Sequence, residues 1–207
     1  MDWIPFARER QSRFGEQHGE LDERSLVRKG NAAYAAGLGL LMAGDPEAVE
    51  WLGRAAVTWR ESWQGGESWG RPIGAIKAAL LAGDDPAAET YAQWALDAGA
   101  ERSESPIGRY AAALALLVLA RWVDARPVAD SLRERDDFPH DVADALAYIA
   151  AHDVVGYAEA IESVVESFET RTEFLEDARV ADTALVLDLL ARRRGIELDL
   201  PESDVLP

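Results

Sequence analysis

A short phrase that recurs between apolar stretches constrains the fold of this chain more than any other sequence feature. It reads Ala43-Gly44-Asp45-Pro46-Glu47-Ala48 and returns 39 residues later as Ala82-Gly83-Asp84-Asp85-Pro86-Ala87-Ala88. Glycine ends a helix readily, aspartate caps the next one, and proline fits at the first helical position. Each copy lies between two amphipathic runs. The phrase therefore predicts helices joined into hairpins by tight turns.

Weaker versions of the phrase extend the pattern. Ala125-Arg126-Pro127 follows 43 residues after Ala82, and Ala151-His152-Asp153 follows 26 residues after that. The intervals of 39 and 43 residues match helical-repeat periods of ~34 to 47 residues, whereas the interval of 26 residues does not. We therefore expect an all-α fold of stacked antiparallel helical hairpins, a degenerate tetratricopeptide-like solenoid.

Hydrophobic periodicity predicts roughly nine to ten helices in a single helical-repeat domain over residues 1–207. The expected helices cover residues 26–43, 45–63, 72–82, 86–98, 105–122, 127–135, 141–151, 154–168 and 177–194. Residues 1–24 form an N-terminal segment, and residues 196–207 form an extended tail after Gly195. Small residues at the expected helix contacts predict close helix approach: Ala32, Ala33, Ala36, Ala55, Ala56, Ala78 and Ala79.

The charge balance limits the partners. Asp and Glu total 38 against 21 Lys and Arg, which gives a net charge of −17. This acidity fits either a salt-adapted cytoplasm or a GC-rich genome, and we interpret it mainly as a solvated surface. Such a surface repels nucleic acid phosphates and anionic lipids. We therefore expect a protein partner of basic character, and neither nucleic acid nor membrane.

Cysteine is absent, which excludes disulfides, thiol catalysis and cysteine-based metal sites. The first fourteen residues lack the apolar core of a signal peptide, and the longest apolar run, residues 111–122, is too short to span a bilayer. We therefore expect a cytoplasmic protein.

Residue patterns for catalysis or cofactor binding are weak. His140-Asp141 and His152-Asp153 lie at expected helix boundaries, where aspartate is common as a cap, so we expect no metal site. The glycines at 65, 66 and 70 lack the lysine and the preceding strand of a phosphate loop. The many carboxylates are interpreted as a surface charge lattice. The sequence therefore predicts no catalytic residue and no cofactor.

Tryptophan provides the candidate binding residues. Four of the seven tryptophans fall between residues 51 and 69. Trp59 and Trp63 lie on the predicted inner helix face and are expected in the core. Trp51 lies off that face and Trp69 follows a glycine loop. Because exposed tryptophan is enriched at binding hot spots, our hypothesis is that Trp51 and Trp69 border a partner-binding groove.

The C-terminal third carries a resemblance to a known family. Residues 175–185 form an acidic start to an Ala/Leu-rich helix, which stops at Arg193-Arg194-Gly195 before a tail ending Ser203-Asp204-Val205-Leu206-Pro207. Together with the preceding hairpin, residues 141–168, this layout resembles an all-helical family of bacterial polymorphic-toxin immunity proteins. The resemblance implies stoichiometric neutralisation of a toxin by occlusion.

The sequence is compatible with three functions. The first is a non-enzymatic protein-binding module, in particular an immunity protein. The second is a general helical-repeat scaffold for protein assembly in the cytoplasm. The third is an enzyme whose active site the sequence does not reveal.

Overall fold

The computed structural model describes residues 1–66 and 68–207, and within them the regular structure is all helical. The α-helices are α1 Trp3–Glu16, α2 Glu23–Met42, α3 Ala48–Glu61, α4 Gly70–Leu81, α5 Asp85–Asp97, α6 Pro106–Val118, α7 Trp122–Arg133, α8 His140–Ala151, α9 Val154–Thr170 and α10 Asp182–Arg194. Two short 3-10 helices, η1 Ala100–Arg102 and η2 Leu175–Asp177, complete the set. The predicted all-α fold class is confirmed.

The recurring phrase encodes one type of helix stop. Gly44 and Gly83 adopt positive φ, and the next amide donates to the carbonyl five residues back, from Asp45 to Leu40 at 2.9 Å and from Asp84 to Ala79 at 3.0 Å. This is the Schellman turn, which satisfies carbonyls left free at a helix end. The same bond closes α6, α8 and α10, where Ala120, His152 and Gly195 have positive φ.

Two predicted boundaries differ clearly from the structure. The helix expected over residues 177–194 begins only at Asp182, because Asp177 has φ 60° and belongs to the 3-10 helix η2. The other difference lies between α6 and α7. The apolar run was expected to continue as helix to Trp122, with a new helix opening at Pro127. Instead α6 ends at Val118, Trp122 opens α7, and Pro127 lies inside α7. Ala120 makes the turn with φ 55°, a conformation that alanine adopts rarely, so the sequence carries no glycine signal there.

The first 24 residues contain a helix that periodicity did not reveal. Helix α1 packs along α2, and a Cβ on Gly39 would stand 2.9 Å from the Phe6 ring, so glycine allows the two helices to approach closely. One inward position of α1 is Arg10, which is buried. A buried arginine interrupts the apolar pattern by which an amphipathic helix is recognised.

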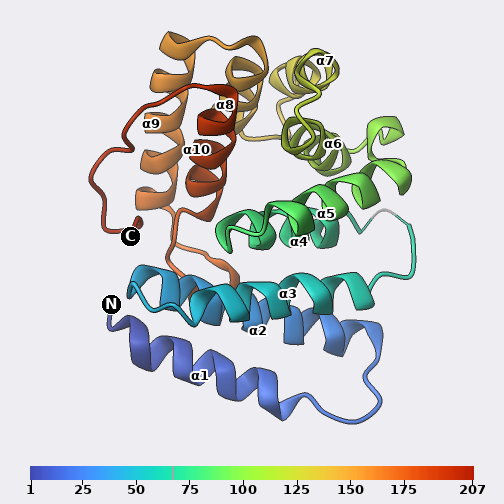
Figure 1. Ribbon diagram of the computed structural model, residues 1–207, viewed down its shortest axis with the longest axis vertical. Coiled ribbons are helices and arrows are strands. Elements are labelled where there is room, and N and C mark those ends of the chain that lie inside the picture. The colour runs from blue at the N-terminus through green and yellow to red at the C-terminus, as the bar shows by residue number, and fades with distance from the viewer. Residues whose placement is uncertain (67) are drawn as a thin grey trace.

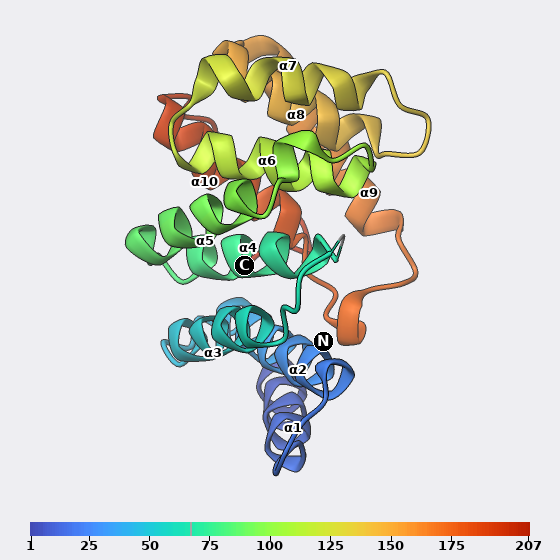
Figure 2. The same ribbon diagram turned by 90° about the vertical axis from the view of Figure 1, so that its right-hand side faces the viewer.

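Consecutive helices pack on one another from α1 to α9 in a hairpin, solenoid-like stack (Figure 1). In the side view the layers ascend from α1 through α4 and α5 to α7 (Figure 2). Helix α10 departs from this order because it folds back against α4, α8 and α9. The C-terminal helix therefore covers one side of the stack formed by the preceding helices.

The helix contacts are rich in alanine, as predicted. All seven alanines expected at close contacts are buried. One face of α9, with Tyr157, Ile161, Val164 and Phe168, is also buried, whereas its glutamates at 159, 162 and 166 are exposed. Residues 196–207 form an extended tail that buries Ile196 and Val205 in the core.

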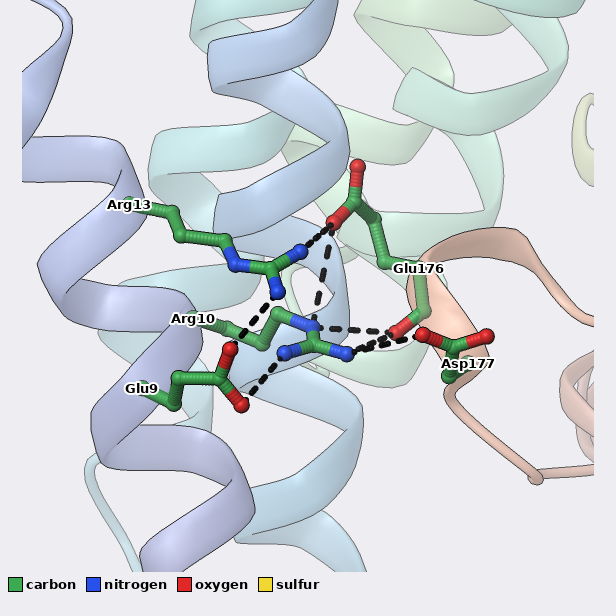
Figure 3. Close-up of polar contacts among 5 residues, drawn as sticks. All are labelled: Glu9, Arg10, Arg13, Glu176 and Asp177. Atoms are coloured by element: carbon green, nitrogen blue, oxygen red, sulfur yellow. Dashed lines mark hydrogen bonds and ion pairs between the residues drawn. The ribbon is translucent and has the colours of Figure 1, made fainter.

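The segment between α9 and α10, residues 171–181, is here named the strap. It descends from the upper helices to touch α2 (Figure 1). Arg10 of α1 holds it by donating from Nε and Nη2 to the Glu176 carbonyl oxygen at 3.0 and 2.7 Å (Figure 3). Glu176 and Asp177 both have positive φ, so this contact fixes a backbone shape that non-glycine residues adopt rarely.

Candidate functional site

A groove on the first three helices is a well-formed concavity of the described structure. It encloses about 730 Å³ between the end of α1, the connection to α2, and the outer face of α3. Phe14, Leu21 and Leu26 contribute apolar surface on one side. Val57 and Gly53 of α3 lie opposite, with Glu50 and Glu61 among the charged lining residues. We refer to it as the α1–α3 groove.

An aromatic and cationic cluster fixes one wall of the groove. The Phe14 and Trp51 rings meet edge to face with centroids 5.3 Å apart, and the Arg54 guanidinium lies 4.5 Å above the Trp51 ring. Lys29 Nζ stands 4.5 Å from the Phe14 centroid and donates to the Gln17 carbonyl at 2.7 Å. Such cation–π contacts order long side chains and hold the end of α1 against α3.

The outer face of α3 carries exposed apolar side chains beside this wall. Val49, Gly53 and Val57 recur every four residues, which places them on one stripe of the helix. Val57 is 50% exposed and Val49 is exposed to a similar degree. An apolar stripe along a groove with a charged rim is the surface that an amphipathic helix or an apolar loop of another protein fits.

The two predicted binding tryptophans are placed differently. Trp51 is half-buried in the cluster at the edge of the α1–α3 groove. Trp69 is only 4% exposed, with its ring centroid 6.0 Å from that of Trp63, and a Cβ on Gly108 would lie 2.8 Å from its Nε1. The expectation that Trp69 borders an open groove is therefore wrong: it packs in the core at the start of α4.

Sequence reasoning missed the apolar groove residues. Phe14 lay in a segment not expected to be helical, and Leu21 belongs to a connection without periodicity. Val57 looked like an ordinary outward position of its helix. Only the fold of the α1–α2 connection beside α3 turns these separate residues into one concave surface. The sole available signal was the spacing of Val49 and Val57 on the polar side of a helix.

A buried polar network lies apart from the groove. Lys77 Nζ of α4 is 2.7 Å from Oδ2 of Asp182, the first residue of α10, and donates to Thr183 Oγ1 at 3.0 Å. The Tyr34 hydroxyl of α2 donates to the same Asp182 oxygen at 2.7 Å. Burial, with the Asp182 carboxylate adding to it, raises the pKa of Tyr34 well above its ordinary value. The network joins three helices distant in sequence.

The histidine pairs act as helix punctuation. His140 is the first residue of α8, His152 closes that helix in the left-handed conformation, and the Asp153 carboxylate caps α9 by accepting from the Gly156 amide at 3.0 Å. Across the described ranges, no group of three or more His, Asp or Glu is arranged to hold a metal ion. Likewise, none of the described helices has the length and apolarity needed to cross a bilayer.

Comparison of the chain with protein-family models, curated proteins and solved structures finds no match. The likeness of the C-terminal third to immunity proteins therefore remains a prediction. The function has to be argued from the surfaces and the charge of this chain.

Proposed function

We propose that this chain is a non-catalytic protein-binding module that takes an apolar segment of a basic partner protein into the α1–α3 groove. The observation that carries the proposal is the groove itself. It combines about 730 Å³ of open concavity with two exposed valines on α3, Val57 in the groove and Val49 two turns before it. An exposed apolar surface beside a charged rim is typical of protein interaction sites.

The negative net charge of the chain favours a basic partner protein. A net charge of −17 attracts a basic protein at long range and accelerates its association. Steering of this kind weakens as salt shortens the Debye length. The proposal therefore includes partner association that slows with added salt, while the apolar contact in the groove persists.

Neutralisation of a basic toxin by occlusion in the cytoplasm is the specific form that the family resemblance suggests. Toxins that cleave nucleic acids tend to be basic because they bind phosphates, so an acidic inhibitor complements them. The alternative within the same class is a scaffold that gathers resident cytoplasmic proteins. The two differ in the identity of the partner.

Affinity capture from the native cytosol at matched salt tests the proposal. The tagged wild-type chain is compared with Val57→Lys, which places a long cation in the groove, and with Val123→Lys as the matched control. Val123 is 87% exposed on α7, far from the groove. We expect one stoichiometric basic protein on wild type and on Val123→Lys, and its loss on Val57→Lys.

The identity of the captured protein distinguishes the immunity function from the scaffold function. A captured toxin domain whose activity stops at one equivalent of this chain supports the immunity form, whereas a set of resident proteins supports the scaffold. Equal capture by Val57→Lys and wild type would overturn the assignment of the groove. Turnover of a substrate by the purified chain would overturn the non-catalytic assignment.

A further inference from the structure

A second concavity lies where the strap and α10 meet the first helices, on different residues from the α1–α3 groove. This junction pocket encloses about 380 Å³. Tyr34 of α2, Trp59 of α3 and Ile73 of α4 form apolar walls, and Leu175 of the strap lies on the other side. Lys77 and Asp182 contribute the ionised groups of the buried network.

The aromatic wall of the pocket is rigid. The Tyr34 and Trp59 ring centroids are 5.1 Å apart. A Cβ on Gly30 or on Gly74 would each come within 2.6 Å of the Trp59 indole, so the indole is held between two glycines. Its Nε1 donates to Asn31 Oδ1 at 3.1 Å, which fixes the ring in its plane. Tyr34 is 3% and Trp59 is 4% exposed, so a ligand meets only the edges of these ordered rings and costs them no further side-chain entropy.

The polar groups of the pocket leave donors free. Lys77 carries three N–H donors, and Asp182 and Thr183 account for two of them. Asn31 uses its carbonyl oxygen for Trp59, and among the described residues its amide nitrogen donates to no acceptor. The acceptor Oδ2 of Asp182, by contrast, is occupied by both Lys77 and Tyr34. A ligand that offers an acceptor therefore fits better than one that offers donors.

The charge balance of the pocket favours a neutral ligand. Lys77 and Asp182 neutralise each other in a nearly buried position, and Arg71, which also lines the pocket, is neutralised by its ion pair with Glu23. A ligand carboxylate would add an unmatched negative charge inside a chain of net charge −17. A ligand cation would compete with Lys77 for Asp182. An amide or ketone carbonyl supplies the acceptor without either penalty.

We propose that the junction pocket binds a small neutral ligand with an apolar body between Leu175 and the exposed edges of Tyr34 and Trp59 and a carbonyl oxygen directed to Lys77 and Asn31. This inference does not rest on the proposed protein-binding function, because the two sites share no lining residue. Pockets with mostly apolar walls and a few converging polar groups are the usual form of small-molecule sites.

The test uses 1-naphthamide as the probe and 1-naphthoate as its charged counterpart, with binding followed by saturation-transfer NMR. Val27→Phe fills the pocket from α2, and Val123→Phe on α7 is the matched control. We expect 1-naphthamide to bind wild type and Val123→Phe equally, to bind Val27→Phe at least roughly tenfold more weakly, and to bind wild type better than 1-naphthoate does.

Circular dichroism checks that both variants keep their helices. If Val27→Phe fails to fold, intermolecular NOEs between naphthamide ring protons and the Ile73 methyl groups decide in the wild-type chain, because Ile73 lines the pocket. Absence of binding up to the solubility of the amide, equal binding by folded Val27→Phe, missing NOEs to Ile73, or tighter binding of 1-naphthoate would each overturn the proposal.

Discussion

Replacement of Arg10 by methionine tests whether the strap is held by the contact with α1. The Arg10 side chain is only 3% exposed, and its guanidinium donates twice to the Glu176 carbonyl, at 3.0 and 2.7 Å. It also pairs with Glu9 at 2.8 Å and with Asp177 at 3.3 Å, as Figure 3 shows. Methionine keeps an apolar stem over the Phe6 ring, which lies 4.5 Å from the guanidinium carbon.

The size of the effect follows from these contacts. A hydrogen bond to a charged group contributes roughly 1.5–3 kcal/mol, but here two donors share one acceptor. The variant also avoids the desolvation of a buried guanidinium, and Glu9 and Asp177 are exposed enough to regain water. We therefore expect Arg10→Met to lower the free energy of unfolding by about 2–3 kcal/mol. For a chain of this size that corresponds to a fall in Tm of about 5–10 °C.

The assay is urea unfolding together with amide hydrogen exchange in the strap. Arg8→Met is the control, because Arg8 lies on the same helix, is 52% exposed and pairs across 3.0 Å with Glu47 on the surface. A surface pair of that kind contributes less than about 1 kcal/mol. In Arg10→Met the amides around Glu176 and Asp177, whose φ values are 53° and 60°, should exchange faster. The reasoning is refuted if Arg10→Met loses no more stability than Arg8→Met, or if the strap amides exchange at the wild-type rate.

Three further predictions follow from backbone geometry and burial. Ala120→Gly should raise the free energy of unfolding by about 1 kcal/mol, since φ is 55° there; no gain in urea unfolding would contradict the proposed strain. Gly74→Ala should destabilise the fold by about 1–3 kcal/mol, because the new Cβ would clash with the Trp59 indole. Gly53→Ala should stabilise the fold slightly, because no atom lies within 4 Å of the new Cβ. Calorimetry that shows the reverse order of stability would refute this. Burial raises the pKa of Tyr157, and the nearby Asp188 carboxylate adds to the rise. The folded state therefore keeps a proton that the unfolded chain releases, and stability is complete below about pH 10 and declines above it. Tyr157→Phe should reduce this decline in urea titrations, and an unchanged alkaline decline would count against it.

Local signals in the sequence were sufficient for most helices. Gly44 and Gly83 end helices where the recurring phrase predicts, and the Asp84 carboxylate caps α5 by accepting from the Ala87 amide at 3.0 Å. The glycine signal for a helix end is missing where another residue adopts the unfavourable conformation, as Ala120 does at the end of α6. Apolar periodicity fails in α1, where Arg10 occupies an inward position because its partner is a carbonyl 166 residues away.

The candidate sites were much less predictable. The two lysines of the chain, Lys29 and Lys77, each have a specific partner inside the fold, which their sequence neighbours do not indicate. Trp69 looked like a surface residue because it follows glycines, but the start of α6 covers it. Neither environment can be read from residue types, because each is created by elements distant in sequence.

The sequence by itself determined the helical hairpins, their alanine-rich contacts and the acidic surface. These follow from periodicity, capping and charge, which act over a few residues or on the chain as a whole. The tertiary structure alone decided that α10 folds back on α4, that the strap is fastened to α1, and that separate side chains enclose the α1–α3 groove and the junction pocket. These features depend on contacts between distant segments, whose geometry is set by packing and by pairing of buried polar groups rather than by local preference.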